Sequence, residues 1–476
     1  MTELWRRSAV DLAGLLRSGQ VSAREVLEAH LARIAEVNPT VNAIITFAFD
    51  RAFEDAARAD ETHARGESLG VLHGLPIAHK DLADTAGIRT TRGSPILADN
   101  VPLVDELLIA RLRAAGCVTL GKTNTPEFGA GSHTFNRLFG VTRNPHDPSR
   151  SAGGSSGGAA AALASGMVPI ADGSDLGGSL RNPASFCGIV GLRPTPGTVP
   201  SWPASDPWDP LATEGPMGRN AADVALVLSA MAGPHPSGPL RGAAGPFGPI
   251  DRSLAGLRVG WSADAGGLPV ERAVQDALAG VPDRLGAHGC VVVDSFPDLK
   301  GAGRVFQTLR AVGFERNLGP LYDERPDDLK DTIRWNIELA RSLRASDVGV
   351  AFRDRGSLQE RVRRFFERYD VFALPTVQVV PFPVEVDWVR EIEGVPLENY
   401  LEWMQSCTDV TVTGCPAISV PAGVTPDGLP VGLQLVAPPG GELLLLQIAH
   451  ALDGDGALDA ARLPSTGSAE ASGLAV

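Results

Sequence analysis

Apolar residues near the start of the chain recur at helical spacing, on a face formed by Val26, Leu27, Leu31, Ile34 and Val37. Ser22 and Glu25 stand just before this run as a Ser-x-x-Glu capping box, which predicts a helix start. Pro39 is expected to end the helix, because proline lacks a backbone donor and clashes with the preceding turn. The pattern predicts a helical N-terminal region over residues 1–65.

Further along, short apolar runs alternate with helical stretches. Residues 107–116 (LLIARLRAAG) have helical spacing and lead into a strand-like CVTL. Later runs that are typical of buried strands are GLRVGW, CVVVDSF, VFALPT, PAISVPAG and PVGLQLVAP. This alternation of strands and helices predicts the α/β fold class.

Composition narrows the class of protein. The chain has 476 residues, 43% of them hydrophobic and 21% charged, as in soluble globular proteins. Lys and Arg number 42 against 56 Asp and Glu, and the formal charge of −14 argues against nucleic acid and membrane surfaces as partners. The sequence shows no apolar leader or spanning run, no Cys-x-x-Cys pair and no Cys/His cluster. We therefore expect a cytoplasmic protein without a metal site or disulfide framework.

Glycine, proline and serine mark three segments of unusual composition. Residues 150–200 hold two Gly/Ser-rich turns, each followed by small or apolar residues suited to a helix or a strand. Residues 232–256 are rich in proline and glycine and are expected to form a surface linker or insertion. Residues 455–476 are small and polar and are expected to form a flexible tail.

Two short motifs suggest functions that their surroundings disfavour. GCVTLGKT, from Gly116 to Thr123, has the letters of a P-loop, but a helix precedes it and its Cys-Val-Thr-Leu is itself strand-like. A buried strand ending at Lys122 is the better interpretation, which leaves nucleotide binding as a minor alternative. GGSSG at 153–157 has the letters of a nucleophile elbow, yet no buried strand precedes it and no later histidine lies in a convincing motif.

The whole constellation resembles the amidase signature family. RSAGGSSGGAAAALASG and ADGSDLGGSLRNPASFCGIVGLRPT resemble its signature stretch, and GLPIAHKD resembles the segment that carries its catalytic lysine. The similarity is close over residues 70–200 and 410–440. It implies that Lys80 is the base, Ser155 a bridging serine held by a cis peptide, and Ser179 the nucleophile. It also implies one α/β/α domain over residues 1–476, built around a large mixed β-sheet flanked by helices, with no metal or organic cofactor.

The residues suit this chemistry. A serine hydroxyl is a weak nucleophile that needs a neighbouring base, and a lysine can serve when desolvation lowers its pKa and leaves it neutral. Ser155 can relay the proton, because a hydroxyl both donates and accepts. The N–H groups of Leu176, Gly177, Gly178 and Ser179 are the expected oxyanion hole. The resemblance implies a supporting ion pair of Asp175 with Arg181, and His79 is expected to be a core histidine or to tune Lys80.

The substrate is less constrained than the reaction. We expect hydrolysis of hydrophobic or aryl amides, with anilides, carbamates and esters as further substrates, by an enzyme that needs no partner protein and whose oligomeric state, homodimer included, stays open. The aromatic residues and the serine expected to shape the pocket are Ser132, Phe135, Phe139, Trp202, Trp208 and Trp403. The alternative is a glutamine-amidase subunit of a tRNA-dependent amidotransferase. Such subunits usually continue after GLRPT with an Arg-Tyr-Gly segment, which PGTVPSWPASDPWDP replaces here.

Overall fold

The computed structural model describes residues 3–454, so the segment 455–476 lies outside the described residues. The N-terminal region contains the helices α1 (Ala9–Arg17), α2 (Ala23–Val41) and α3 (Phe49–Ala64). The capping box of Ser22 and Glu25 is confirmed, because each side chain bonds the backbone N–H of the other residue. Two expectations for this region are wrong. Pro39 lies inside the last turns of α2, and a strand, β1 (Ile44–Phe47), separates α2 from α3.

Two sheets form the centre of the molecule. The larger is mixed and has eight strands in the order β10-β9-β11-β15-β14-β7-β8-β6, and the smaller has three in the order β1-β3-β2. An isolated parallel bridge between Ile77 and Ile170 joins the two sheets at their adjacent edges. The strands are β2 (Pro76–Lys80), β3 (Val118–Thr123), β6 (Ala171–Asp175), β7 (Val190–Arg193), β8 (Thr213–Gly218), β9 (Arg258–Trp261), β10 (Val291–Asp294), β11 (Val371–Pro375), β14 (Ala417–Val424) and β15 (Pro430–Val436).

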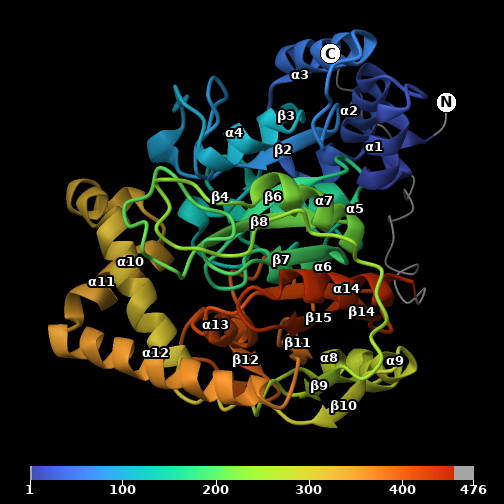
Figure 1. The fold of residues 1–476 in the computed structure, drawn as a ribbon. Coiled ribbons are helices and arrows are strands. Elements are labelled where there is room, and N and C mark those ends of the chain that lie inside the picture. The colour runs from blue at the N-terminus through green and yellow to red at the C-terminus, as the bar shows by residue number, and fades with distance from the viewer. Residues whose placement is uncertain (1–2, 455–476) are drawn as a thin grey trace.

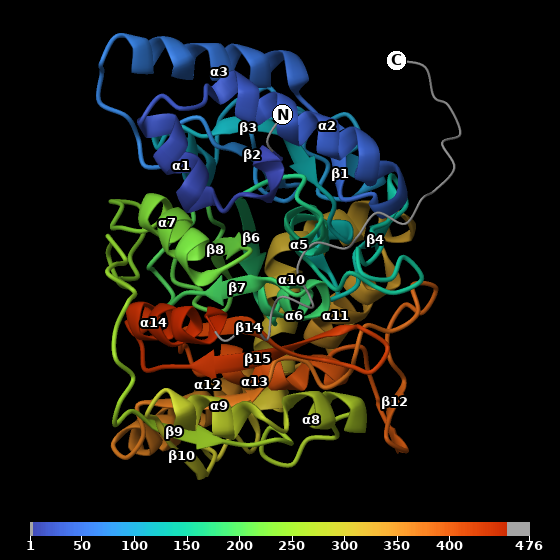
Figure 2. The ribbon, with the colours of Figure 1, turned by 90° about the vertical axis from the view of Figure 1, so that its right-hand side faces the viewer.

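Helices cover the sheet from both sides, which confirms the predicted α/β class. Figures 1 and 2 show α7 (Ala221–Met231) and α14 (Glu442–Asp453) on one side of the large sheet. On the other side lie α10 (Ala302–Glu324), α11 (Asp331–Ser342) and α12 (Ala345–Phe366). The remaining helices are α4 (Leu107–Ala114), α5 (Gly157–Ala164), α6 (Arg181–Cys187), α8 (Arg272–Leu278), α9 (Val281–Ala287) and α13 (Gln405–Thr411).

The P-loop interpretation fails on the structure of β3. The residues that a P-loop would use as a phosphate-binding loop form a fully buried strand, paired with β2 on one side and β1 on the other. Lys122 is buried within it and donates a hydrogen bond to Thr85 Oγ1 at 2.7 Å. A phosphate therefore has no glycine-rich loop to enter here.

The signature stretch folds into a compact unit at the end of the large sheet that adjoins the small sheet. Its glycine-rich turns lead into α5 and α6, and its strands β6 and β7 lie on either side of β8. Gly158 shows why small residues are required, since a Cβ there would lie 2.3 Å from the backbone nitrogen of Asn124. The segment 232–256 contains no helix or strand and connects α7 to β9. No described helix between residues 3 and 454 is both long and apolar enough to span a membrane.

Candidate active site

Lys80 ends strand β2 and is almost completely buried, with 1% of its surface exposed. Its Nζ donates hydrogen bonds to Ser155 Oγ at 2.8 Å, Ser156 Oγ at 2.9 Å and Ser174 Oγ at 3.0 Å. These partners are neutral hydroxyl groups, so none compensates a positive charge directly. Burial lowers the pKa of Lys80 to about 7, against the opposing influence of Asp175 and Asp172. A substantial fraction of this amine is therefore neutral at neutral pH.

The Gly/Ser-rich turn before α5 brings Ser155 to this lysine. The Gly154–Ser155 peptide is cis, and Ser155 is 2% exposed. The next residue, Ser156, donates its backbone N–H to the carbonyl oxygen of Ser179 at 3.2 Å, which joins the two serine-bearing turns. Ser179 itself is partly exposed, whereas Lys80 and Ser155 are buried. The structure therefore places the three residues at one site and leaves Ser179 as the one open to an incoming ligand.

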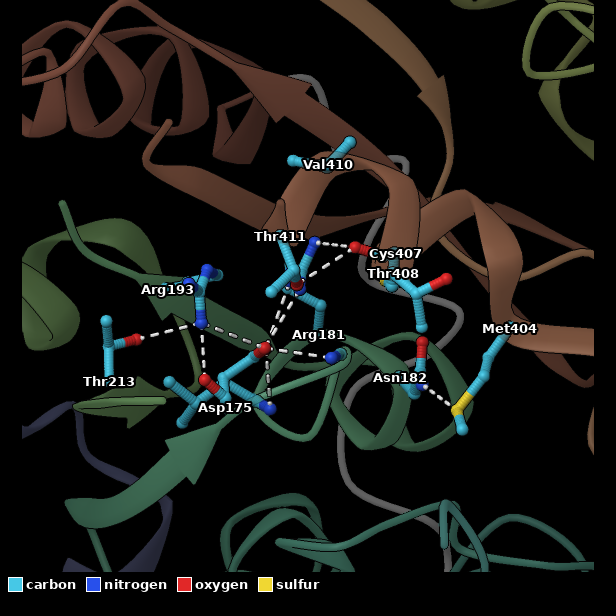
Figure 3. A network of polar contacts seen from close by, with 12 residues as sticks. Asp175, Arg181, Asn182, Arg193, Thr213, Met404, Cys407, Thr408, Val410 and Thr411 are labelled. Carbon is cyan, nitrogen blue, oxygen red and sulfur yellow. Dashed lines mark hydrogen bonds and ion pairs between the residues drawn. The ribbon is translucent and has the colours of Figure 1, made fainter. Parts of the chain in front are cut away.

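The turn that carries Ser179 is tied down by buried charges (Figure 3). Asp175 accepts two hydrogen bonds from Arg181, at 3.0 Å from Nε and 2.9 Å from Nη2, and Arg193 approaches it to 3.4 Å. Burial alone would raise the pKa of Asp175, but the two arginines outweigh it and hold that pKa well below its usual range. Arg193 was missed from the sequence, although it is the arginine of GLRPT at the end of β7.

This buried network predicts a large stability effect. We expect Asp175→Asn to lower the free energy of unfolding by about 3–5 kcal/mol, because both arginines would lose their buried counter-charge. Chemical denaturation followed by circular dichroism measures the change. Glu28→Gln is the matched control, since its ion pair with Arg24 is exposed and should be worth at most about 0.5 kcal/mol. Equal effects of the two substitutions would contradict the account of the network.

The backbone between Asp175 and Arg181 corrects one expectation about the oxyanion hole. The Gly178 N–H donates to Asp175 Oδ1 at 2.8 Å, so it is already satisfied and is not free to bind an oxyanion. Close packing explains the paired glycines. A Cβ on Gly177 would lie 2.7 Å from Phe306 Cζ, and one on Gly178 would lie 2.6 Å from Asn182 Nδ2.

His79 is a core histidine with partners for both ring nitrogens. Its Nδ1 pairs with Asp172 Oδ2, and its Nε2 lies 3.1 Å from Thr119 Oγ1. Asp172 also accepts the backbone N–H of Lys80 at 2.9 Å. His79 therefore contributes to the position of the strand that carries Lys80. Within residues 3–454 no group of three or more His, Cys, Asp or Glu side chains is arranged to hold a metal ion.

Two cavities lie near this site. The first, of about 560 Å³, is here called the apolar cavity. Its wall includes the apolar side chains of Leu82, Phe128, Leu176, Leu309 and Phe314. Charged residues also line it, namely Arg92, Glu106, Asp206, Asp209, Arg310 and Arg316. The second, of about 540 Å³, is called the charged cavity, and its wall includes Ser132, Phe135, Lys330, Asp387 and Trp403.

The aromatic residues predicted for the pocket divide between these surroundings. Phe135 and Trp403 line the charged cavity together with Ser132. Phe139, Trp202 and Trp208 line neither cavity, and the two tryptophans are 43% and 66% exposed. The loop 196–210, which carries Trp202 and Trp208, does line the apolar cavity, but with smaller residues such as Pro203 and Ala204.

A mixed sheet with a buried lysine bonded to serine hydroxyls fits an amide-hydrolysing enzyme. The chain belongs to the Amidase family, whose model matches residues 25–446. It is 37% identical to an acylamidase of Rhodococcus erythropolis, over 93% of this chain and 94% of that one. It is 34% identical to a glutamyl-tRNA(Gln) amidotransferase subunit of Alkaliphilus metalliredigens, over 91% and 93%. The crystal structure of a bacterial aryl acylamidase of the amidase signature family matches with a TM-score of 0.89 at 27% identity, covering 96% of this chain and 98% of the other.

Proposed function

We propose that this amidase hydrolyses hydrophobic or aryl amides through an acyl-enzyme on Ser179, with Lys80 as the base and Ser155 as the proton relay. The observation that carries the proposal is the 2.8 Å contact between Lys80 Nζ and Ser155 Oγ, in a setting that lowers the lysine pKa to about 7. A neutral amine in contact with a hydroxyl can accept its proton, and that hydroxyl can in turn take a proton from a second serine.

Each step then has a residue to perform it. Ser179 Oγ attacks the amide carbon while its proton passes to Ser155, whose own proton passes to Lys80. The oxyanion accepts hydrogen bonds from the backbone N–H groups of Leu176 and Gly177, with Ser179 as a third donor. The C–N bond breaks as the amine leaves with a proton returned through Ser155. Water then attacks the ester of Ser179 by the same relay and releases the acid.

The pair of Asp175 and Arg181 supports this chemistry by position. Asp175 accepts the N–H groups of Gly178 and Leu180, and Arg181 begins the helix that follows Ser179. Since Arg193 also binds the carbonyl oxygen of Asp175, the backbone is fixed at both ends of the turn. We propose that this fixed turn holds the remaining N–H groups in place before the oxyanion forms.

The wall of the apolar cavity supports the choice of substrate. Leu176 belongs both to this wall and to the proposed oxyanion segment, so a ligand at Ser179 borders the cavity. The apolar part of this wall favours hydrophobic and aryl groups. Two similar proteins are described as an acylamidase and an aryl acylamidase, which agrees with this choice. We propose small-molecule amides as the main substrates, with carbamates and esters accepted where the acyl carbon is equally exposed.

The amidotransferase relatives support a second candidate function, glutamine hydrolysis as the subunit of an amidotransferase. Two of these glutamyl-tRNA(Gln) amidotransferase subunits are 34% and 36% identical to this chain over more than nine-tenths of its length. On that alternative, glutamine would be the substrate and a partner protein would be required. Comparing glutamine with 4-nitroacetanilide as substrates of the isolated chain separates the two functions, and efficient glutamine hydrolysis with an inert anilide would favour the alternative.

Phe128 tests the role of the apolar cavity. We expect Phe128→Ala to lower kcat/KM for aryl amides by about 10-fold or more, because an aromatic side chain contributes roughly 1.5–3 kcal/mol of apolar contact. Hydrolysis of acetamide, which is too small to reach this wall, should be almost unchanged. Trp208→Ala is the matched control, since that ring is exposed and lies outside the cavity wall. A larger loss in the Trp208 variant than in the Phe128 variant would place the aryl group elsewhere.

A further inference from the structure

The charged cavity contains a lysine without a close carboxylate partner among the described residues. Lys330 stands at the start of α11 and is partly buried. Its Nζ donates one hydrogen bond, to the carbonyl oxygen of Ala130 at 3.3 Å, and lies 4.0 Å from the centre of the Phe135 ring. No carboxylate of residues 3–454 forms an ion pair with it. Two of the three ammonium hydrogens are therefore available to a ligand.

Two of the neighbouring carboxylates, those of Glu127 and Asp331, already bind other groups. Glu127 accepts from Ser94 Oγ at 2.7 Å and from the backbone N–H of Lys330 at 3.1 Å. Asp331 pairs with Arg334. Burial lowers the pKa of Lys330 to about 8, against the carboxylates of Asp387, Glu127 and Asp331, so the group is mostly charged at neutral pH. Asp387 is the carboxylate that opposes an incoming anion most directly.

The segment 127–132 lines both cavities and lies between Lys330 and Ser155. Phe128 faces the apolar cavity, whereas Gly131 and Ser132 face the charged one. A Cβ on Gly129 would lie 3.5 Å from Ser155 Oγ, and a Cβ on Gly131 would lie 3.8 Å from Lys330 Nζ. Because two residues of chain span at most about 7 Å, one elongated substrate can reach both groups.

The position of Ser155 assigns a side to each half of the substrate. A Cβ on Gly129, which would approach Ser155, would also lie 2.9 Å from Leu82 Cδ1, and Leu82 lines the apolar cavity. Ser155 returns the proton to the leaving amine in the proposed function, so the amine half belongs on the side of the apolar cavity. The acyl half then extends past Ser132, whose Oγ accepts from Asn182 Nδ2 at 3.0 Å under the oxyanion segment.

We propose that the charged cavity binds an anionic group on the acyl half of the substrate and that Lys330 is its specificity-determining residue. The preferred substrates are then amides of dicarboxylic acids, with an aryl or hydrophobic amine at the scissile end and a free carboxylate at the other. This inference rests on the proposed function, since it assumes that the scissile carbonyl lies at Ser179.

Paired chromogenic substrates test the inference. We would measure kcat and KM for the mono-4-nitroanilides of glutaric, adipic and pimelic acids, each against the alkanoyl 4-nitroanilide in which a methyl group replaces the carboxylate. The wild-type enzyme is expected to prefer the carboxylate member of at least one pair by about 10-fold or more in KM, as for a hydrogen bond to a charged group. Lys330→Met should remove this preference, and Lys330→Arg should keep most of it.

A second variant keeps the test independent of folding defects. Asp387→Asn is expected to lower KM for the carboxylate substrates alone, because it removes a repelling charge. Arg24→Met is the control, since that exposed arginine of α2 is paired with Glu28 and does not line the cavity. Hydrolysis of the alkanoyl anilides without any preference for a carboxylate would overturn the inference and leave the proposed function standing. Inactivity toward every anilide of both series would instead contradict the proposed function itself.

Discussion

Ser179→Ala is expected to lower kcat by at least about 10⁴-fold, because loss of a hydrolase nucleophile removes the covalent route altogether. Ser179 is partly exposed and lies on the turn fixed by Asp175, whereas Ser155 is buried against Lys80. Ser155→Ala should also lower kcat strongly, since the proton of Ser179 then has no hydroxyl group to carry it to Lys80. Initial rates with an aryl amide, normalised to folded protein, measure both losses.

A serine far from the site supplies the control for this prediction. Ser253 is exposed in the proline- and glycine-rich connection before β9, and Ser253→Ala should leave kcat unchanged. Full activity of Ser179→Ala, together with inactive Ser155→Ala, would mean that Ser155 is the nucleophile. The interpretation of GGSSG as a nucleophile elbow would then be correct.

Lys80 sets the second large effect, which depends on pH. The amine must be neutral to accept a proton, and burial lowers its pKa to about 7. The value of kcat/KM should therefore be low at acidic pH, rise through about pH 7 and level off on the alkaline side. Lys80→Ala should lower kcat/KM by about 10²–10⁴-fold and abolish this rise.

A second buried lysine offers a matched control. Lys122 has a pKa lowered to about 8 by burial, but its Nζ bonds Thr85 and the backbone of Ala83 instead of the catalytic serines. Lys122→Met should reduce stability and leave the midpoint of the pH profile in place for the protein that remains folded. A midpoint that moves in the Lys122 variant and stays in place in active Lys80 variants would contradict the assignment of the base.

The parts of the site predicted from the sequence are those that short motifs specify. GLPIAHKD, GGSSG and LGGSLR set their polar residues among small or apolar neighbours, and the resemblance of these motifs to the family's assigns Lys80, Ser155 and Ser179 within them. The buried strands near the C-terminus were also predicted, because their continuous apolar runs are typical of strands covered on both faces.

The contacts that the sequence left open depend on the tertiary structure. Arg193 joins Asp175 only because β7 and β6 flank β8 in the sheet. The Gly178 N–H is occupied because Asp175 folds back over its own turn, which residue types alone do not reveal. Pro39 does not stop α2 at once: the helix continues for two more residues, to Val41. The exposure of Trp208 follows from the path of a loop without regular periodicity.

The central claim is that the acyl group is carried by Ser179 and activated through Ser155 and Lys80. The most direct test is to treat the enzyme with a fluorophosphonate and to map the adduct by tandem mass spectrometry of the digested protein. We predict a single adduct on Ser179 in the wild-type enzyme, a slower adduct at the same residue in Ser155→Ala, and no adduct in Ser179→Ala. An adduct on Ser155, retained in Ser179→Ala and lost in Ser155→Ala, would contradict the claim.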